Sequence, residues 1–260
     1  MRQFGLLGFP LTHSFSKKYF TEKFSAEKLD AAYDNFAIPS ISDFPQLISG
    51  HPNLVGMNVT IPYKQAVMQF LDALDEEAAA VGAVNTIKFT KSENGKPFLT
   101  GYNTDLIGFR ESIRPFVEQL KSRLQQSGDK GTFKLKALIL GTGGASKAVC
   151  YGLKQLKVET LFVSRSERPG CITYDKLTPD YYTKYQIIVN TTPLGMNPNA
   201  DTFAPLDYES IGASHLLFDA VYNPELTRFL QIGAERGALI KNGLEMLHLQ
   251  AEAAWKIWNA

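Results

Sequence analysis

Three kinds of polar side chain gather at the end of a predicted strand, in the run NVTIPYK at residues 58–64. Strand alternation places Asn58 and Thr60 on one face with Pro62, which cannot donate to a sheet ladder and therefore ends the strand. Lys64 begins the next segment on the same side as these two hydrogen-bonding groups. A lysine after a strand is usually only solvated, but an amide, a hydroxyl and an ammonium group together suit a ligand that carries hydroxyl groups.

A glycine-rich turn joins a predicted strand, residues 134–140, to a predicted helix, residues 146–156. Glycines let backbone amides approach a pyrophosphate, and the helix N-terminus adds partial positive charge. This order of elements indicates a dinucleotide-binding unit, although the third glycine of GxGxxG falls at Ser146. A turn that only packs helix on strand is the alternative. An NTPase loop is not expected, because Ala148 stands where such a loop has its magnesium-binding residue. The candidate cofactor-binding residues of the turn are Gly141, Thr142, Gly143, Gly144 and Ala145.

A basic segment, SRSER at residues 164–168, follows the next predicted strand, residues 161–163. At this point a carboxylate usually binds the ribose of NAD. Arg165 indicates a 2′-phosphate instead, because guanidinium and phosphate match in geometry and charge, and Ser164 can add a hydrogen bond. The segment therefore favours NADP, and a solvated surface loop is the alternative.

Strand-like runs alternate with helical stretches along the chain, which predicts an α/β fold. In the first half, strands are predicted at residues 6–8, 33–38 and 56–61, and amphipathic segments at residues 17–29 and 65–74. After a polar passage at residues 121–132, further strands are predicted at residues 137–140, 160–163, 187–189 and 216–218.

The domain boundary is predicted near residue 107, ahead of a helix at residues 109–124. A last helix, residues 244–258, carries both tryptophans and is expected to return to the first domain. We therefore expect a first α/β domain of residues 1–107 and 241–260, and an inserted Rossmann-type dinucleotide-binding domain of residues 108–240.

The composition is that of an ordinary globular protein, with 260 residues, 44% hydrophobic residues and a formal charge of +1. Near-neutral charge argues against a nucleic-acid partner, and no run reads as a signal peptide or a bilayer-spanning segment. Cys150 and Cys171 form no CxxC pair, and the four histidines are scattered. We expect a reduced, cytoplasmic protein without a metal site.

These segments resemble the shikimate dehydrogenase family over nearly the whole chain. Residues 58–64 match its NVTxPxK motif, with Lys64 in the catalytic position, and residues 101–108 match the segment whose aspartate, here Asp105, partners the lysine. Asp105 alone could equally be a helix cap. The resemblance implies a reversible NADPH-dependent reduction of 3-dehydroshikimate to shikimate, in the biosynthesis of chorismate and aromatic amino acids, with proton transfer by Lys64.

The resemblance also implies the substrate contacts. Residues 8–16 look like the family's substrate loop, in which two serines hold the carboxylate; Ser16 could also cap the helix predicted to begin at Lys17. His13 in this loop is interpreted as a turn or packing residue. Residues 82–86, 218–224 and 242–250 match segments that contribute an asparagine, a tyrosine and a glutamine. The implied substrate-binding residues are Ser14, Ser16, Asn58, Thr60, Asn85, Tyr222 and Gln250.

On the cofactor side, residues 190–196 resemble a loop near the cofactor, Ala220 matches a residue at the nicotinamide, and Gly243 matches a glycine at the cofactor. Glu76 matches a cofactor-side position, although an exposed acid on a turn needs no special explanation. The family often has asparagine where Ser164 stands. This departure falls in the segment on which the predicted preference for NADP over NAD depends.

Two alternatives stay open. One is an NAD-linked quinate/shikimate dehydrogenase, and the other is a non-catalytic regulator that binds nucleotide or shikimate. Retention of both Lys64 and Asp105 argues against the regulator. The partner is expected to be a small-molecule substrate, and the protein a monomer or homodimer.

Overall fold

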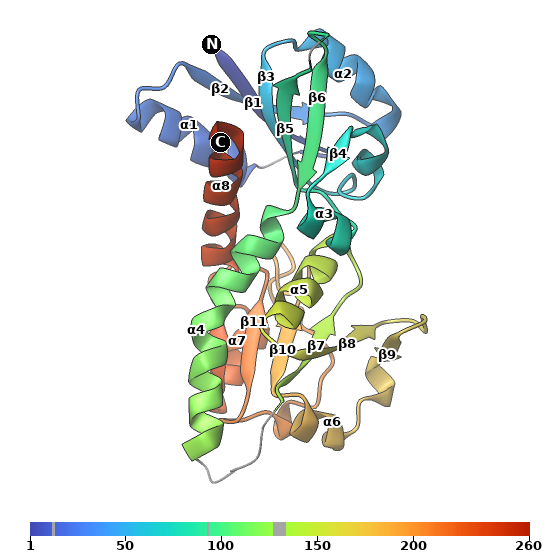
Figure 1. The fold of residues 1–260 in the computed structure, drawn as a ribbon. Helices are drawn as coiled ribbons and strands as arrows, with labels where there is room; N and C mark the ends of the chain where they lie inside the picture. Colours follow the sequence, from blue (N-terminus) through green and yellow to red (C-terminus); the bar gives the residue numbers. More distant parts are fainter. Residues whose placement is uncertain (12–13, 93, 127–133) are drawn as a thin grey trace. The chain divides into compact units, whose positions relative to one another are not determined.

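The computed structural model describes residues 1–11, 14–92, 94–126 and 134–260 (Figure 1). These residues form two compact units: unit 1 is Met1–Thr104 with Ala251–Ala260, and unit 2 is Asp105–Gln250. The chain passes between them inside α4 (Thr104–Gln126) and inside α8 (Leu244–Asn259). His13 and residues 127–132 of the predicted polar passage lie outside the described residues.

Unit 1 is built on a mixed sheet with the strand order β2-β1-β3-β5-β6-β4. Its strands are β1 (Arg2–Gly8), β2 (Ala31–Ala37), β3 (Leu54–Val59), β4 (Ala73–Leu74), β5 (Thr86–Lys91) and β6 (Pro97–Tyr102). The helices of this unit include α1 (Phe15–Ala26), α2 (Phe44–Gly50) and α3 (Glu76–Val81). Because β1 pairs in parallel with β2 and β3, the segments that follow β1 and β3 leave the sheet at the same edge.

The two faces of this sheet are covered by different elements. Leu7, Met57 and Val59 belong to a core that includes Phe44 of α2. Phe4 and Leu6 belong to a core with Phe20 of α1 and Trp258 of α8. The Trp258 indole donates to the Ile87 carbonyl at 3.0 Å, and a Cβ at Gly56 would lie 2.4 Å from the same ring. The end of α8 therefore belongs to unit 1, as the prediction for the last helix requires.

Unit 2 is built on a parallel sheet with the strand order β12-β11-β10-β7-β8-β9. Its strands are β7 (Lys136–Leu140), β8 (Glu159–Ser164), β9 (Cys171–Thr173), β10 (Ile187–Asn190), β11 (Leu216–Asp219) and β12 (Leu239–Lys241). The helices include α5 (Gly144–Gln155), α6 (Pro179–Lys184) and α7 (Arg228–Glu235). Counted from β7, this is the doubly wound order 3-2-1-4-5-6, which reverses between β7 and β10. The predicted α/β class is confirmed.

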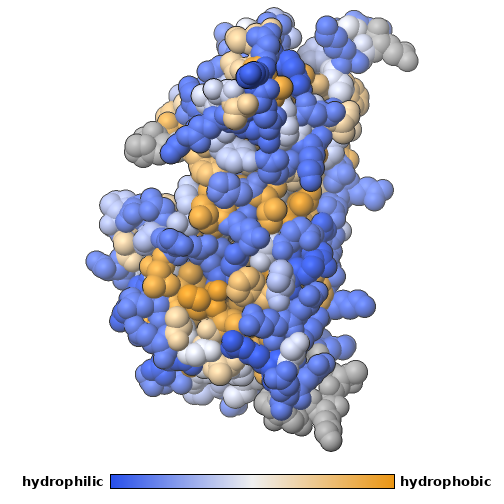
Figure 2. All heavy atoms as spheres, turned by 90° about the vertical axis from the view of Figure 1, so that its left-hand side faces the viewer, coloured by the Kyte–Doolittle hydropathy of each residue, from blue (hydrophilic) through white to orange (hydrophobic). Residues whose placement is uncertain are grey.

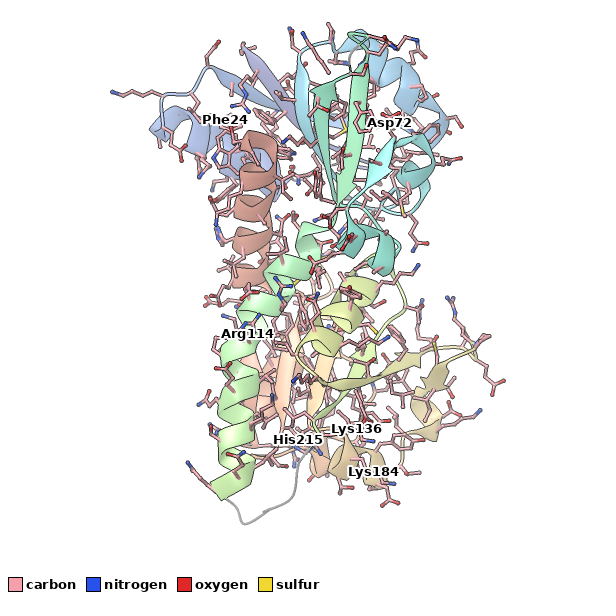
Figure 3. The ribbon with its side chains drawn as sticks, in the orientation of Figure 1. Phe24, Asp72, Arg114, Lys136, Lys184 and His215 are labelled. Atoms are coloured by element: carbon pink, nitrogen blue, oxygen red, sulfur yellow. The ribbon has the colours of Figure 1, made fainter. Side chains whose placement is uncertain are left out.

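Several predicted boundaries were wrong. Strand β3 ends at Val59 rather than residue 61, and Ile61 is 74% exposed. Helix α4 begins at Thr104 rather than residue 109. Residues 65–74 form the short 3-10 helix η2 (Ala66–Phe70) and strand β4 rather than one amphipathic helix. Asp72, labelled in Figure 3, explains this, because its carboxylate accepts from the Leu99 amide at 2.7 Å and holds the chain beside β6.

Candidate functional site

Asn58 is the centre of a buried polar network in unit 1. It lies in β3 directly opposite Thr86 of β5, and only 4% of it is exposed. Its amide nitrogen donates to the Asn85 carbonyl at 3.4 Å and to the Thr86 hydroxyl at 3.3 Å. Its amide oxygen accepts from the Tyr33 hydroxyl at 2.7 Å. A buried amide with three partners is fixed in one orientation.

Asn85 continues this network toward the start of α4. Its side-chain oxygen accepts from the Thr104 amide at 2.6 Å, and its side-chain nitrogen donates to the Thr104 hydroxyl at 3.0 Å. The hydroxyls of Thr86 and Thr104 lie 3.0 Å apart. The Asn85 carbonyl also accepts from the Val59 amide at 2.8 Å, which links the loop before β5 to the end of β3.

Thr60 and Lys64 lie on the short segment that follows β3, and both are half-buried. The Thr60 amide donates to the Leu7 carbonyl at 2.8 Å, and the Lys64 carbonyl accepts from the Val84 amide at 2.7 Å. These backbone bonds attach the segment to β1 on one side and to the Asn85 loop on the other. Unit 1 therefore brings Asn58, Thr60, Lys64 and Asn85 to one edge of its sheet.

The two serines of the N-terminal loop have different structural positions. Ser14 is the N-cap of α1, and its hydroxyl accepts from the Lys17 amide at 3.0 Å. The helix begins at Phe15, two residues before the predicted start at Lys17, so Ser16 lies inside the first turn and is not its N-cap. Burial raises the pKa of the Tyr33 phenol, and a side-chain hydrogen bond with Ser16 opposes this increase. Ser16 is thus next to the buried network.

The glycine turn of unit 2 lies between β7 and α5, at the point where the strand order reverses. Gly141 has a φ of +107°, and a Cβ there would lie 2.9 Å from the Thr191 hydroxyl oxygen, so only glycine fits. Gly143 caps α5 without a side-chain hydrogen bond, and a Cβ there would meet no described atom within 4 Å. The space beside the start of α5 at Gly143 is therefore open, and a helix N-terminus with free backbone amides suits a pyrophosphate.

Helix α5 begins at Gly144, two residues earlier than predicted. Thr142 and Ala145 are half-buried on either side of this start. Ser146 is fully buried, and its hydroxyl donates to the Gly143 carbonyl at 2.6 Å. The departure from GxGxxG at Ser146 is therefore accommodated inside the turn.

The basic segment after β8 contains a residue that the sequence interpretation missed. Arg168 donates to the Thr142 hydroxyl at 3.2 Å, which places its guanidinium beside the glycine turn. Arg165 is exposed, and the Ser164 hydroxyl accepts from the Ser166 amide at 3.3 Å. The spacing R-x-x-R in residues 165–168 was the available signal, but the contact joins residues 26 positions apart. Arg168 therefore joins Arg165 as a candidate for binding an anionic group of a cofactor.

A buried carboxylate fixes the loops that follow β10 and β11. Asp219 is fully buried and accepts from the Asn190 side chain at 2.9 Å, the Val221 amide at 3.0 Å and the Thr227 hydroxyl at 2.6 Å. Burial raises the pKa of Asp219 to about 6, and these hydrogen bonds oppose the increase. A Cβ at Gly243 would lie 2.3 Å from the Ala220 carbonyl oxygen, so these two residues meet at a site where only glycine fits.

The remaining candidate residues lie on helices or exposed loops. Asp105 is in the first turn of α4 and is 9% exposed. Gln250 is buried and donates to the Leu247 carbonyl at 2.9 Å. Tyr222 is 38% exposed, and burial of the rest of its ring raises the pKa of its phenol. Glu76 is exposed in the first turn of α3, a common place for an acid.

Comparison with known proteins shows similarity along the whole chain. Residues 6–87 match the family model described as the shikimate dehydrogenase substrate binding domain. The protein named Shikimate dehydrogenase (NADP(+)) from Caldicellulosiruptor saccharolyticus is 33% identical over 99% of this chain and 92% of its own length. The chain belongs to the shikimate dehydrogenase family.

Other members of the shikimate dehydrogenase family support this assignment. The protein of the same name from Clostridium beijerinckii is 36% identical over 99% of this chain and 92% of its own length. The crystal structure of shikimate 5-dehydrogenase from Thermus thermophilus, solved with NADP(H) and shikimate, has a TM-score of 0.79 at 27% identity. It covers 99% of this chain and 93% of that chain.

This shikimate dehydrogenase family member has the surface of a globular protein. On the face drawn in Figure 2, hydrophobic residues gather in separate patches among hydrophilic ones. Among the described residues, no helix has both the length and the apolar character required to cross a membrane. Across the same part of the chain, no three His, Cys, Asp or Glu side chains cluster where they could hold a metal ion.

Proposed function

We propose that this chain is an NADP-dependent shikimate dehydrogenase that catalyses the reversible reduction of 3-dehydroshikimate to shikimate, in the biosynthesis of chorismate and aromatic amino acids. The observation that carries the proposal is its similarity, along 99% of the chain, to proteins named Shikimate dehydrogenase (NADP(+)). The strand order and glycine turn of unit 2 support dinucleotide binding. The amide, hydroxyl and ammonium groups at one edge of unit 1 support binding of a hydroxylated ring.

The proposal assigns a role to each domain. Residues 1–107 and 241–260 form the substrate-binding catalytic domain, and residues 108–240 form the NADP-binding Rossmann domain. The compact units divide slightly differently, at Thr104 and Gln250, because both connections are continuous helices. The difference places Asp105 and Gln250 in unit 2 although both are assigned to the substrate-binding catalytic domain.

The residues of unit 2 fit the proposed cofactor. The turn from Gly141 to Ala145 would hold the pyrophosphate, and Arg165 with Arg168 and Ser164 would hold the 2′-phosphate. Ala220 would lie at the nicotinamide, and Gly243 and Glu76 are assigned to the cofactor. When bound, the cofactor supplies the hydride that reduces the ketone carbon.

The remaining candidate residues are assigned to substrate binding and proton transfer. Ser14 and Ser16 bind the carboxylate, and the ring hydroxyls and the carbonyl oxygen are contacted by Asn58, Thr60, Asn85, Tyr222 and Gln250. Lys64 donates a proton to the carbonyl oxygen as the new C–H bond forms, and it takes the proton back in alcohol oxidation. Asp105 orients the lysine.

One assay tests the proposal. Absorbance of the reduced nicotinamide is followed with shikimate or quinate, each with NADP or NAD. Fastest turnover with shikimate and NADP is expected. Comparable rates with quinate and NAD would identify the NAD-linked quinate/shikimate enzyme. Shikimate binding by calorimetry without turnover in any of the four reactions would identify the regulator.

Oligomeric state and location belong to the same proposal. We expect a monomer or homodimer that acts in the cytoplasm on a small-molecule substrate. Light scattering coupled to gel filtration measures the mass directly, and a mass above that of two chains of 28.9 kDa would contradict the expectation.

A further inference from the structure

Tyr33 is a buried tyrosine that the proposed mechanism does not use. Only 3% of it is exposed, and its ring stacks on Phe20 of α1 with centroids 4.9 Å apart and an interplanar angle of 13°. A phenylalanine would fill the same space without burying a hydroxyl group. The hydroxyl must therefore satisfy a polar partner, and that partner is the Asn58 amide oxygen at 2.7 Å.

The hydrogen bonds around Asn58 fix which way its amide points. The Asn85 carbonyl can only accept, so the nitrogen of the Asn58 amide must face it. The oxygen of the amide then faces Tyr33, and the phenol must donate its hydrogen. Without this donor the buried oxygen has no partner in the network, and a rotated or flipped amide becomes competitive.

We propose that Tyr33 is a positioning residue for the substrate site, and that its hydroxyl fixes the Asn58 amide and, through it, the Asn85 loop. The inference rests on the proposed function. Tyr33 lies in β2, Asn58 in β3 and Thr86 in β5, so the hydrogen bonds join β2 to the strand that holds Asn58 and to the strand that directly follows Asn85. The Ser16 side chain opposes the increase in the pKa of the same phenol, so it lies beside Tyr33. One buried hydroxyl thus lies between the residues assigned to the substrate carboxylate and those assigned to its hydroxyls.

Tyr33→Phe is the direct test, and Tyr63→Phe is its matched control. Tyr63 lies in the same unit, is 5% exposed, and its hydroxyl donates to the Ile38 carbonyl at 2.6 Å. Tyr33→Phe should raise the KM for shikimate roughly threefold to tenfold, the range of one neutral hydrogen bond, and leave the Kd for NADP unchanged. Both variants should lower Tm, but Tyr63→Phe should leave the KM for shikimate within about twofold of wild type.

A double-mutant cycle with Asn58→Leu separates positioning from general loss of stability. If Tyr33 acts through Asn58, adding Tyr33→Phe to Asn58→Leu should raise KM no further. Adding Tyr33→Phe should also leave Tm unchanged or higher. Asn58→Leu alone leaves the buried Tyr33 hydroxyl without its acceptor, and Tyr33→Phe removes that hydroxyl. A further threefold increase in KM would overturn the inference, as would unchanged KM in Tyr33→Phe alone. Absence of shikimate turnover in the wild-type protein would instead refute the proposed function.

Discussion

The two units hold their candidate site residues in different ways. In unit 1, buried side chains bond to one another, and the Asn58 amide alone has three partners. In unit 2, glycines allow the backbone to approach its neighbours closely. Gly141 has a φ of +107°, and a Cβ at Gly243 would lie only 2.3 Å from the Ala220 carbonyl oxygen. Unit 1 should therefore be sensitive to removal of a polar atom, and unit 2 to addition of a carbon atom.

Lys64→Met should have the largest effect. The variant keeps much of the stem but removes the proton donor, so turnover should fall by roughly a hundredfold to ten-thousandfold. Binding should change far less, because the Lys64 backbone bond to Val84 does not depend on the side chain. Turnover is measured together with the Kd values of shikimate and NADP. Near-normal turnover, or a loss explained by weaker binding, would remove Lys64 from the catalytic role.

Arg165→Ala and Arg168→Ala test the one part of unit 2 that is assigned to side chains rather than to close approaches of the backbone. These two arginines are assigned to the 2′-phosphate of NADP. Each should weaken NADP binding by roughly tenfold to a hundredfold, the range for a hydrogen bond to a charged group, with little effect on NAD. Lys184→Ala, at the end of α6, controls for removal of an exposed positive charge. Equal weakening of NADP and NAD would contradict the assignment of this loop to the 2′-phosphate.

Asp219 provides a pH test of unit 2. Its pKa of about 6 lies above the ordinary value of 3.8, so between these pH values the folded state holds a proton that the unfolded state has released. Stability should therefore fall as pH rises from about 4 through 6, by at most about 3 kcal/mol from this group. In Asp219→Asn this contribution disappears, and the Thr227 hydroxyl can accept from the new amide.

The measurement is urea unfolding of wild type and Asp219→Asn at pH 4 to 7. Relative to wild type, the variant should gain stability steadily as pH rises through 6. Asp201→Asn, at an exposed position, controls for loss of a carboxylate charge. Parallel stability curves for wild type and Asp219→Asn would show that burial of Asp219 has no thermodynamic consequence.

Patterns confined to neighbouring residues could be predicted from the sequence. Alternation and apolar runs located β1, β2 and β3 of unit 1 and β7, β8, β10 and β11 of unit 2, but not β5 and β6. The glycine-rich turn was recognised from residues 141–145 because backbone freedom is a local property. The 3-10 helix and short strand in residues 65–74 could not be predicted, because the contact of Asp72 with Leu99 joins distant parts of the chain. The same reason explains why Arg168 was missed.

Gly141→Ala and Gly143→Ala sharpen the comparison within a single turn. A side chain at Gly141 is strained by its φ of +107° and crowded by Thr191, so unfolding free energy should fall by about 1–3 kcal/mol. Gly143 has an ordinary φ of −82° and open space around the added carbon. Its variant should lose less stability, about 1 kcal/mol as an N-cap, but should bind NADP less tightly. Equal stability losses would show that strain at Gly141 is unimportant.

Ser14→Ala and Ser16→Ala give the smallest expected effects and separate two roles that the sequence pattern left combined. Ser14 caps α1 through the Lys17 amide, so its variant should lose about 0.5–2 kcal/mol of stability. Ser16 caps nothing, and its variant should change stability by less than about 0.5 kcal/mol. Both variants should raise the KM for shikimate, since each hydroxyl is assigned to the carboxylate.

Thermal melts and shikimate kinetics on the two single variants decide the matter, with Ser25→Ala at the far end of α1 as the control. A raised KM in Ser16→Ala at unchanged Tm would isolate substrate binding from helix stability, because no cap is lost there. If only Ser14→Ala raises the KM for shikimate, in proportion to its loss of stability, the two serines affect substrate binding only through the N-cap of α1.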